Sequence, residues 1–173
     1  MNLGRGTIGL VAFLAVTLTA CGYHFAGRGN FPAGVSRVFI TIFENRTSET
    51  GVENTFTNDL IYEFTRNRQE SIARDPSSAD SILTGTILRL SVENISRATV
   101  STAVERRVTG VVNLHLESAD GRTLWSSGNI IERQAYTVVT GNKTATDRNK
   151  SDAIAVLSSK IAETAFTQMT DNF

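Results

Sequence analysis

The chain has few of the residues on which metal centres, disulfides and histidine-based catalysis depend. Its 173 residues include one cysteine, Cys21, and two histidines, His24 and His115. A single thiol forms no internal disulfide, and neither histidine has another histidine or cysteine at metal-ligand spacing. With so few imidazoles, a histidine-based catalytic triad is also disfavoured. We therefore predict no metal, no cofactor and no enzymatic activity.

An excess of one charge and a long apolar run are also missing. The 17 Lys and Arg residues equal the 17 Asp and Glu residues, so the formal net charge is zero. The broad basic surface of a nucleic-acid-binding protein is therefore absent. The apolar run Ile8–Val16 is much shorter than the ~20 residues that cross a bilayer core. A transmembrane helix is disfavoured for this segment.

The N-terminal segment has the features of an export signal. Arg5 lies before the apolar run, and small residues lie just before Cys21. A positive start, a short apolar centre and small residues at the cleavage point are typical of a secretory signal peptide. We predict a signal peptide over residues 1–20 and a mature chain that begins at Cys21. A buried structural thiol is the alternative role for Cys21.

The segment Leu18–Cys21 resembles the lipobox of bacterial lipoproteins. This resemblance implies a thioether-linked diacylglycerol on Cys21 and an acyl chain on its new amino group. Each buried CH₂ contributes about 0.8 kcal/mol, so two or more acyl chains anchor a protein stably. Gly22, where retained lipoproteins have Asp, implies sorting to the outer membrane. The Gly-rich residues 21–34 are predicted to be a lipidated tether.

Hydrophobic periodicity predicts one domain over residues 35–173. In chain order, the predicted elements are a strand at 35–43, a helix from Thr50 to about 66, a long strand at 82–95, a strand at 104–117, a return strand at about 122–138 and a helix at about 151–169. Polar loops are predicted at 44–49 and 140–150, and a short strand near Ile72. Thr50 and Glu53 form a capping-box pattern at the start of the first helix.

Alternation within the strands predicts which side chains share a face. In the first strand, these are Val38, Ile40 and Ile42. In the long strand, they are Ile82, Thr84, Thr86, Leu88, Leu90 and Val92. Asp120-Gly121 predicts a type I′ hairpin turn, and Gly128 interrupts the alternation of the return strand and predicts a bulge.

This order predicts a two-layer α+β sandwich (β-α-β-β-β-α), with two helices on one face of a mostly antiparallel sheet. The other face then lacks helices. Phe39 and Trp125 are candidates for a partner-facing surface there, because exposed apolar faces mark interaction sites. Packing of both rings inside the domain is the alternative.

Three segments carry a family resemblance. They are Cys21–Gly27 (CGYHFAG), Val38–Glu53 with its run VFITIFENRT and later GVE, and Ala79–Gly85 (ADSILTG). Together they resemble the LptE-type lipopolysaccharide-assembly lipoproteins. The resemblance implies a plug inside the lumen of the outer-membrane β-barrel LptD. It also implies that the protein assists assembly of this barrel and, with it, delivers lipopolysaccharide to the outer leaflet.

The same resemblance implies lipopolysaccharide binding by basic residues in loops near one end. The candidates in this chain are Arg97, Arg106, Arg107, Lys143, Arg148 and Lys150. Their chemistry is charge-assisted hydrogen bonding to phosphate groups. Solvated surface charge is the alternative for each of them. Arg106 is the best single candidate, because strand alternation turns it toward the apolar face.

Two other functional classes remain open from the sequence. A generic outer-membrane lipoprotein scaffold of a secretion or envelope complex would share the anchor and the fold but have a different partner. A periplasmic enzyme would require a closed pocket that holds a nucleophile and a base with shifted pKa values.

Overall fold

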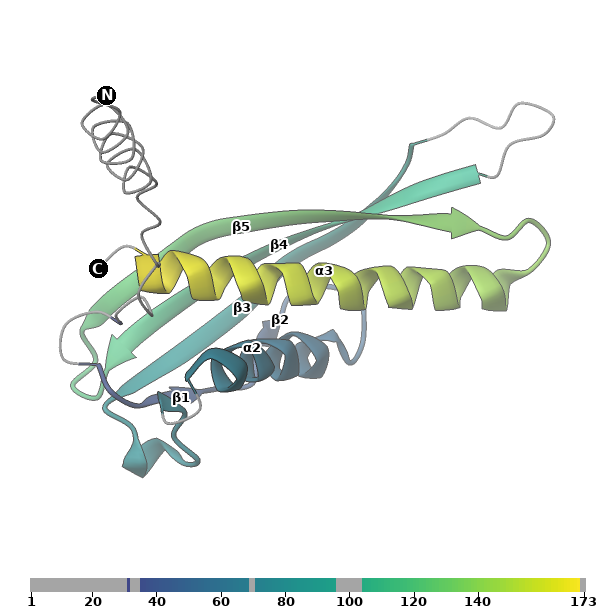
Figure 1. Ribbon diagram of the computed structural model, residues 1–173. Helices are drawn as coiled ribbons and strands as arrows, with labels where there is room; N and C mark the ends of the chain where they lie inside the picture. The colour runs from purple at the N-terminus through teal and green to yellow at the C-terminus, as the bar shows by residue number, and fades with distance from the viewer. Residues whose placement is uncertain (1–30, 32–34, 69–70, 96–103, 172–173) are drawn as a thin grey trace, which may run out of the picture.

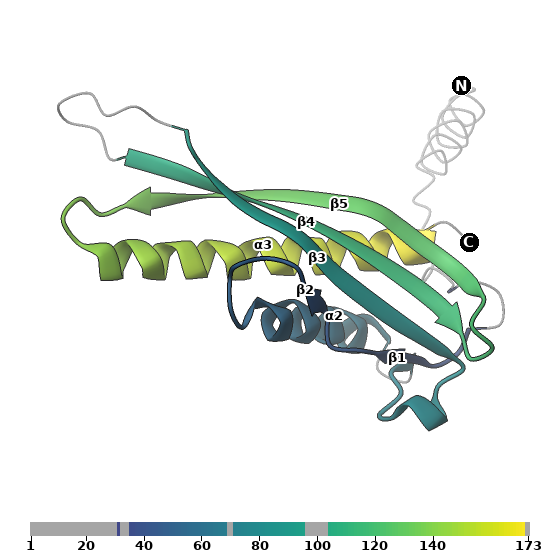
Figure 2. The ribbon, with the colours of Figure 1, turned by 180° about the vertical axis from the view of Figure 1, so that it is seen from behind.

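Two helices cover one face of a five-stranded sheet (Figure 1). The computed structural model describes residues 31, 35–68, 71–95 and 104–171. Its elements are β1 (Val38–Ile40), β2 (Glu44–Asn45), α2 (Val52–Arg68), a 3₁₀ turn at Pro76–Ser78, β3 (Ser81–Asn94), β4 (Val104–Ser118), β5 (Thr123–Val138) and α3 (Lys143–Asp171). Among the described residues, no helix lies on the opposite face of the sheet (Figure 2). The predicted α+β class and element order are confirmed.

The sheet order is β1-β3-β4-β5, and β2 also pairs with β3. The two short strands β1 and β2 run parallel to β3, whereas the β3–β4 and β4–β5 pairs are antiparallel. Val38 also forms an isolated parallel bridge with Ile72, where the sequence predicted a short strand. The sheet is therefore mostly antiparallel, with one mixed edge.

The first strand is shorter than predicted. β1 ends at Ile40, and the chain pairs again as β2 at Glu44–Asn45, inside the predicted polar loop. Val38 and Ile40 are buried, but Ile42 is 68% exposed, so the prediction that all three share a buried face is wrong. Phe43 provides the next buried side chain, because the chain changes direction between the two short strands.

For the first half of β3, the prediction of which side chains face the core is wrong. Leu83 and Ile87 are fully buried there, while Ile82 and Leu88 are only half-buried. The register shifts between Ile87 and Arg89, which marks a bulge in β3. A bulge adds one residue to a strand and reverses its alternation. From Leu90 onward, the even-numbered side chains therefore face the helices.

The β4–β5 hairpin confirms the predicted connection but not its turn type. Gly121 has φ +84°, while no residue other than glycine has a positive φ among the described residues. A type I′ turn needs positive φ at both central residues, so Asp120 excludes it. In β5, Gly128 has φ +61° next to a register shift opposite Asn113 and His115, which confirms the predicted bulge.

Helix α2 lies where the sequence predicts it, and its residues Val52, Phe56, Leu60 and Phe64 are buried. Helix α3 begins eight residues before the predicted start, at Lys143. The Oδ1 atom of Asn142 accepts a hydrogen bond from the Ala145 main chain at 3.0 Å. Asn142 is therefore the N-cap of α3, and most of the predicted polar loop at 140–150 is helix.

The core lies between the sheet and the two helices. Phe64 is fully buried, stacks on Phe31 at 5.8 Å between ring centroids and meets Phe166 edge-on at 5.1 Å. Phe31 is only 6% exposed, so packing extends beyond the predicted domain start at residue 35. Among the described helices, none is both long and apolar enough to cross a membrane.

Candidate functional site

The sequence candidates gather at one end of the sheet, called here the distal end. At this end β3 finishes at Asn94, β4 begins at Val104, β5 finishes at Val138 and α3 begins at Lys143. Antiparallel pairing brings these four termini together, and the Asn94–Arg106 and Val104–Val138 pairs show it directly. The distal end lies on the right of Figure 1.

Arg106 and Arg107 point to opposite faces of β4. Arg106 has the same parity as the buried Val108 and is half-buried on the helix-facing side. Its Nε atom donates to Oδ1 of Asn94 at 3.0 Å. Arg107 lies on the other face, where its guanidinium is 3.3 Å from the Glu93 carboxylate. The structure therefore places two neighbouring guanidinium groups on two separate surfaces.

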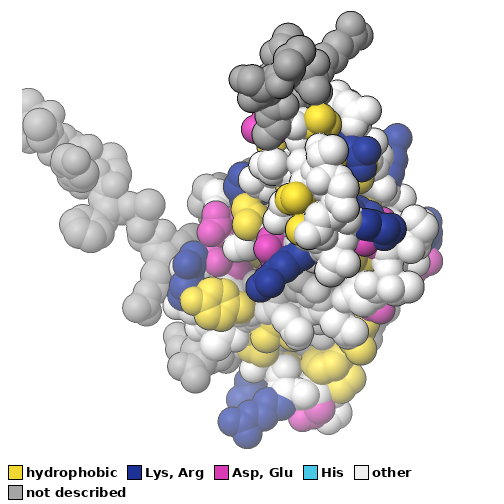
Figure 3. All heavy atoms as spheres, turned by 90° about the vertical axis from the view of Figure 1, so that its right-hand side faces the viewer, with side chains coloured by type: hydrophobic (Ala, Val, Ile, Leu, Met, Phe, Trp, Pro, Cys, Tyr) yellow, Lys and Arg dark blue, Asp and Glu magenta, His cyan; other side chains and the backbone are white. Residues whose placement is uncertain are grey.

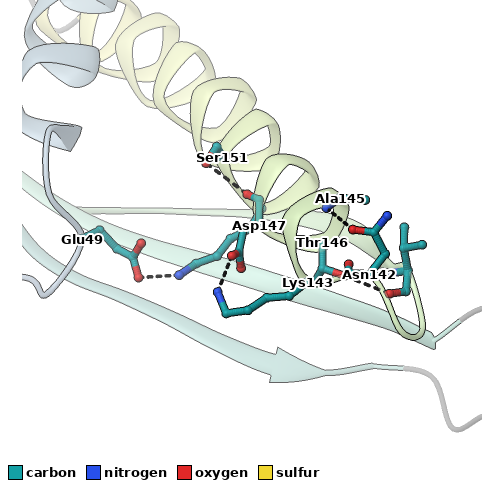
Figure 4. A network of polar contacts seen from close by, with 9 residues as sticks. Glu49, Asn142, Lys143, Ala145, Thr146, Asp147 and Ser151 are labelled. Carbon is teal, nitrogen blue, oxygen red and sulfur yellow. Dashed lines mark hydrogen bonds and ion pairs between the residues drawn. The ribbon is translucent and has the colours of Figure 1, made fainter.

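Helix α3 supplies three further cations in its first turns: Lys143, Arg148 and Lys150. Lys143 pairs with Asp147 one turn later on the same helix (Figure 4). Lys150 pairs with Glu49, in the loop before α2, and both side chains are only partly exposed. Arg148 is exposed, and no described carboxylate pairs with it. The Lys150–Glu49 pair ties α3 to the start of α2.

Two candidates cannot be placed. Cys21 and Arg97 lie outside the described residues. The remaining five cations are at the distal end, but most are paired with an acid or an amide. Figure 3, which faces this end, shows Lys and Arg dispersed among acidic, apolar and neutral side chains. The distal end therefore presents separate cationic groups, most of which already have a polar partner.

Sequence reasoning missed the apolar side chains of the distal end. Val92 is 42% exposed, Ile95 36% and Val139 39%. The alternation of β3 places Val92 in a buried row, and the sequence has no signal that the strands extend beyond the cover of α2. Apolar groups next to separate cations make this end suitable for an amphiphilic ligand.

The two aromatic candidates lie in different environments. Trp125 is 8% exposed, pairs across the sheet with the fully buried Leu116 and belongs to the core. Its placement on the helix-free face is therefore wrong, and the alternative of packing inside the domain holds. Phe39 lies between the inward-facing Val38 and Ile40 and is half-buried, so alternation turns it to the helix-free face.

The grooves of the described surface carry little reactive chemistry. One groove of about 300 Å³ lies between β5 and α3, and one of about 190 Å³ lies between the start of α2 and α3. Among the described residues, the carboxyls with a shifted pKa all have it lowered: Glu44 chiefly by Arg46, Glu53 chiefly by its own main-chain N–H, Asp75 chiefly by Ser77 and Asp120 chiefly by Ser118. These hydrogen bonds belong to the end of β2, to turns and to a helix start, and a lowered pKa does not suit a general base.

Comparison with solved structures identifies the same fold in bacterial lipoproteins. A minor lipoprotein from Acinetobacter baumannii is 12% identical, with a TM-score of 0.53 over 80% of this chain and 93% of that one. A lipoprotein from Caulobacter crescentus is 13% identical, with a TM-score of 0.53 over 75% and 88%. Uncharacterized lipoprotein B from Nitrosomonas europaea is 15% identical, with a TM-score of 0.53 over 80% and 84%. At these identities the likeness establishes the fold alone.

Sequence comparison identifies the family. No curated protein matches the chain. The sequence model of the LptE family, described as lipopolysaccharide-assembly, matches residues 35–169. This match spans the whole described sheet and nearly all of α3. The chain therefore belongs to the LptE lipopolysaccharide-assembly family.

Proposed function

We propose that this protein is an outer-membrane lipoprotein that plugs the LptD β-barrel, assists its assembly and takes part in lipopolysaccharide delivery to the outer leaflet. The observation that carries the proposal is the LptE family match over residues 35–169. The shape of the two-layer domain supports the proposed plug. The domain is elongated, with the distal end at one end of the sheet and the β4–β5 hairpin at the other (Figure 1), and an elongated body suits the lumen of a barrel. The role is one of binding and assembly, without catalysis.

The proposal includes the organisation of the chain. Residues 1–20 are the signal peptide, Cys21 carries the lipid, the tether runs from Cys21 to the packed Phe31, and residues 35–173 form the rest of the domain. Phe31 supports a short tether, since its ring is already packed against Phe64 and lies under Arg68, 5.1 Å from the guanidinium carbon. The acyl chains on Cys21 then hold the domain at the membrane surface.

The distal end is the proposed contact with lipopolysaccharide. Arg106, Arg107, Lys143, Arg148 and Lys150 supply cations there, and Arg97 belongs to the same proposed set. Phosphate groups accept charge-assisted hydrogen bonds from guanidinium and ammonium groups. The exposed Val92, Ile95 and Val139 suit the apolar part of the same amphiphile.

Affinity purification and depletion test the main proposal. The tagged full-length protein is purified from detergent-solubilised outer membranes, and the expected result is co-purification of one large β-barrel, LptD. Depletion of the protein should lower both mature LptD and surface lipopolysaccharide. A generic scaffold would recover a different partner and leave surface lipopolysaccharide unchanged, which would contradict the proposal.

A variant of the lipidated residue tests the anchor. Cys21→Ala should abolish acylation and leave the protein unprocessed or soluble, as fractionation and mass spectrometry of the N-terminus measure. Cys21→Ser is the matched control for size and polarity, and it should behave in the same way because it also lacks the thiol. A mature Cys21→Ala protein that remains anchored in the membrane would contradict the lipid assignment.

A further inference from the structure

The two edges of the sheet differ at the distal end. β5 is the edge strand on one side, and α3 runs along it (Figure 2). β3 forms the other edge once its short partner β2 has ended. Unpaired main-chain groups on an edge strand are a template for pairing with another strand. An edge is available to another strand where its outward main-chain N–H and C=O groups have no hydrogen-bond partner.

Side chains close the distal edge of β5. The Asn149 Nδ2 atom donates to the Thr137 carbonyl at 2.8 Å, and the Gln134 side-chain amide donates to the Ala135 carbonyl at 3.3 Å. The hydroxyl of Thr146 accepts from the Val139 main-chain N–H at 3.0 Å. The Gln134 amide is itself held by Lys160, whose Nζ lies 2.9 Å from Oε1. An incoming strand would have to displace this row of contacts.

The distal edge of β3 has no such closure among the described residues. The Ile95 main-chain N–H donates to the Glu105 carbonyl at 3.0 Å, which sets the phase of the β3–β4 ladder. In an antiparallel pair, alternate residues turn their N–H and C=O outward. Leu90, Val92 and Asn94 are therefore the outward residues, and no described residue hydrogen-bonds to their main chains.

The same edge is already paired over its other half. β1 pairs with Ser81–Leu83, β2 pairs with Thr86–Ile87, and the last contact of this row is the Arg46 N–H to the Ile87 carbonyl at 3.0 Å. Beyond Ile87, the outer edge of β3 has no pairing strand among the described residues, and its side chains are less covered, since Ser91–Asn94 are all exposed. An additional strand would continue an existing row and lie beside the exposed Val92 side chain.

We infer that the distal edge of β3, at Leu90–Asn94, is a strand-addition site for an extended segment of the barrel partner. This inference rests on the proposed function, because the occupant is a segment of that partner. The added strand pairs with the outward N–H and C=O groups of Leu90, Val92 and Asn94. Main-chain hydrogen bonds supply the affinity, and the apolar row at Val92 favours an apolar side chain on the partner.

A proline at position 92 tests this site without breaking the sheet. The Val92 N–H points away from β4, so Val92→Pro removes a donor that the fold does not use and blocks strand addition. Tagged full-length Val92→Pro should fold normally by circular dichroism. It should recover about tenfold less barrel from solubilised membranes, because the hydrogen bond from the Val92 N–H to the added strand is lost and the proline ring keeps that strand at a distance.

Two control variants isolate the effect. Val92→Thr keeps the N–H and the strand propensity and changes only the side chain, so it should recover much more barrel than Val92→Pro. Ala135→Pro places the same residue at an outward position of the closed β5 edge, and it should also leave recovery unchanged. If Val92→Pro folds and recovers the barrel like the wild type, the inference is overturned. If Val92→Pro instead dissociates a self-associated form of the chain, the occupant is a second copy and the inference is also wrong.

Failure of the proposed function gives a different result. If the wild-type protein recovers no barrel at all, the proposed function itself fails. If the wild type recovers the barrel and Val92→Pro does so equally, only the strand-addition site fails.

Discussion

The ring of Phe43 lies directly against the bare main chain of Gly85. A Cβ atom at position 85 would be 2.5 Å from Cε2 and Cζ of this ring, which is closer than carbon atoms approach in proteins. Gly85 is a buried residue of β3, and Phe43 is buried between β3 and α2, where it also contacts Phe56. The absence of a side chain at Gly85 therefore allows Phe43 to close the core beside the two short strands.

Gly85→Ala should destabilise the fold by about 1–3 kcal/mol, because the added methyl group forces the Phe43 ring to move. Without this contact, alanine would stabilise a strand position relative to glycine, so the sign of the change is informative. Urea unfolding measures the free energy. In a double-mutant cycle, the loss caused by Gly85→Ala should shrink in a Phe43→Leu background. Equal losses in both backgrounds would show that the two residues do not interact.

The sequence predicts only in part which side chains of β3 face the helices. Apolar residues occur at both parities before the bulge, with Ile82 and Leu88 on one face and Leu83 and Ile87 on the other. Alternation alone cannot choose between two such rows, and the choice depends on where α2 packs. The bulge at Leu88 then restores the predicted row from Leu90 onward. A strand can therefore be predicted correctly in extent and incorrectly in orientation.

The start of α3 shows a different limit of sequence reasoning. The first two turns of α3, from Lys143 to Lys150, contain Ala145 as their only apolar side chain and so have no apolar stripe. The predicted start follows the first periodic residues, whereas Asn142 begins the helix through its cap. Antiparallel strand order does predict that the basic residues meet at one end. Their ion pairs with Glu49 and Glu93 depend on tertiary geometry and could not be predicted. The pair of Lys143 with Asp147 is local to α3, and predicting it requires the earlier helix start.

Asn142→Ala should destabilise the protein by about 0.5–2 kcal/mol, since the Ala145 N–H loses its acceptor at the start of α3. Asn142→Asp keeps an oxygen at the same position and adds a negative charge at the positive end of the helix dipole, so it should retain the stability. Thermal or urea unfolding measures both variants. An equal loss for the alanine and aspartate variants would argue against the cap.

The hairpin turn predicts an acid-shifted titration. The Ser118 hydroxyl, and then the Arg122 guanidinium, lower the pKa of Asp120 to about 2. Because the folded pKa is below the usual value, the stabilisation is complete above pH ~4 and is lost as the pH falls through about 2. Carbon-13 NMR titration of the carboxyl measures this pKa.

Ser118→Ala should raise the pKa of Asp120 toward its usual value, because the largest cause of the shift is removed. Ser126→Ala is a matched control on β5, where the Ser126 hydroxyl contacts Gly128 instead of Asp120. This control should leave the titration of Asp120 unchanged. A titration of Asp120 near pH 4 in the wild-type protein would contradict the hairpin geometry.

Arg106 and Arg107 provide a matched pair for the proposed lipopolysaccharide contact, since they are adjacent on β4 and point to opposite faces. Arg106 lies on the face shared with Val92, beside Asn94. Arg106→Ala should lower the affinity for purified lipopolysaccharide by about tenfold or more, because a charge-assisted hydrogen bond contributes about 1.5–3 kcal/mol. Arg107→Ala, which removes an exposed pair with Glu93, should change the affinity much less.

Surface plasmon resonance with immobilised lipopolysaccharide measures both affinities, and urea unfolding verifies that neither variant loses the fold. Arg106→Lys keeps the charge but not the planar donor pair, so its affinity should lie between those of the wild type and Arg106→Ala. The comparison separates a specific contact from general attraction to a polyanion. If both alanine variants lose affinity equally, the glycolipid responds only to total charge, and the helix-facing side of the distal end is not its binding surface.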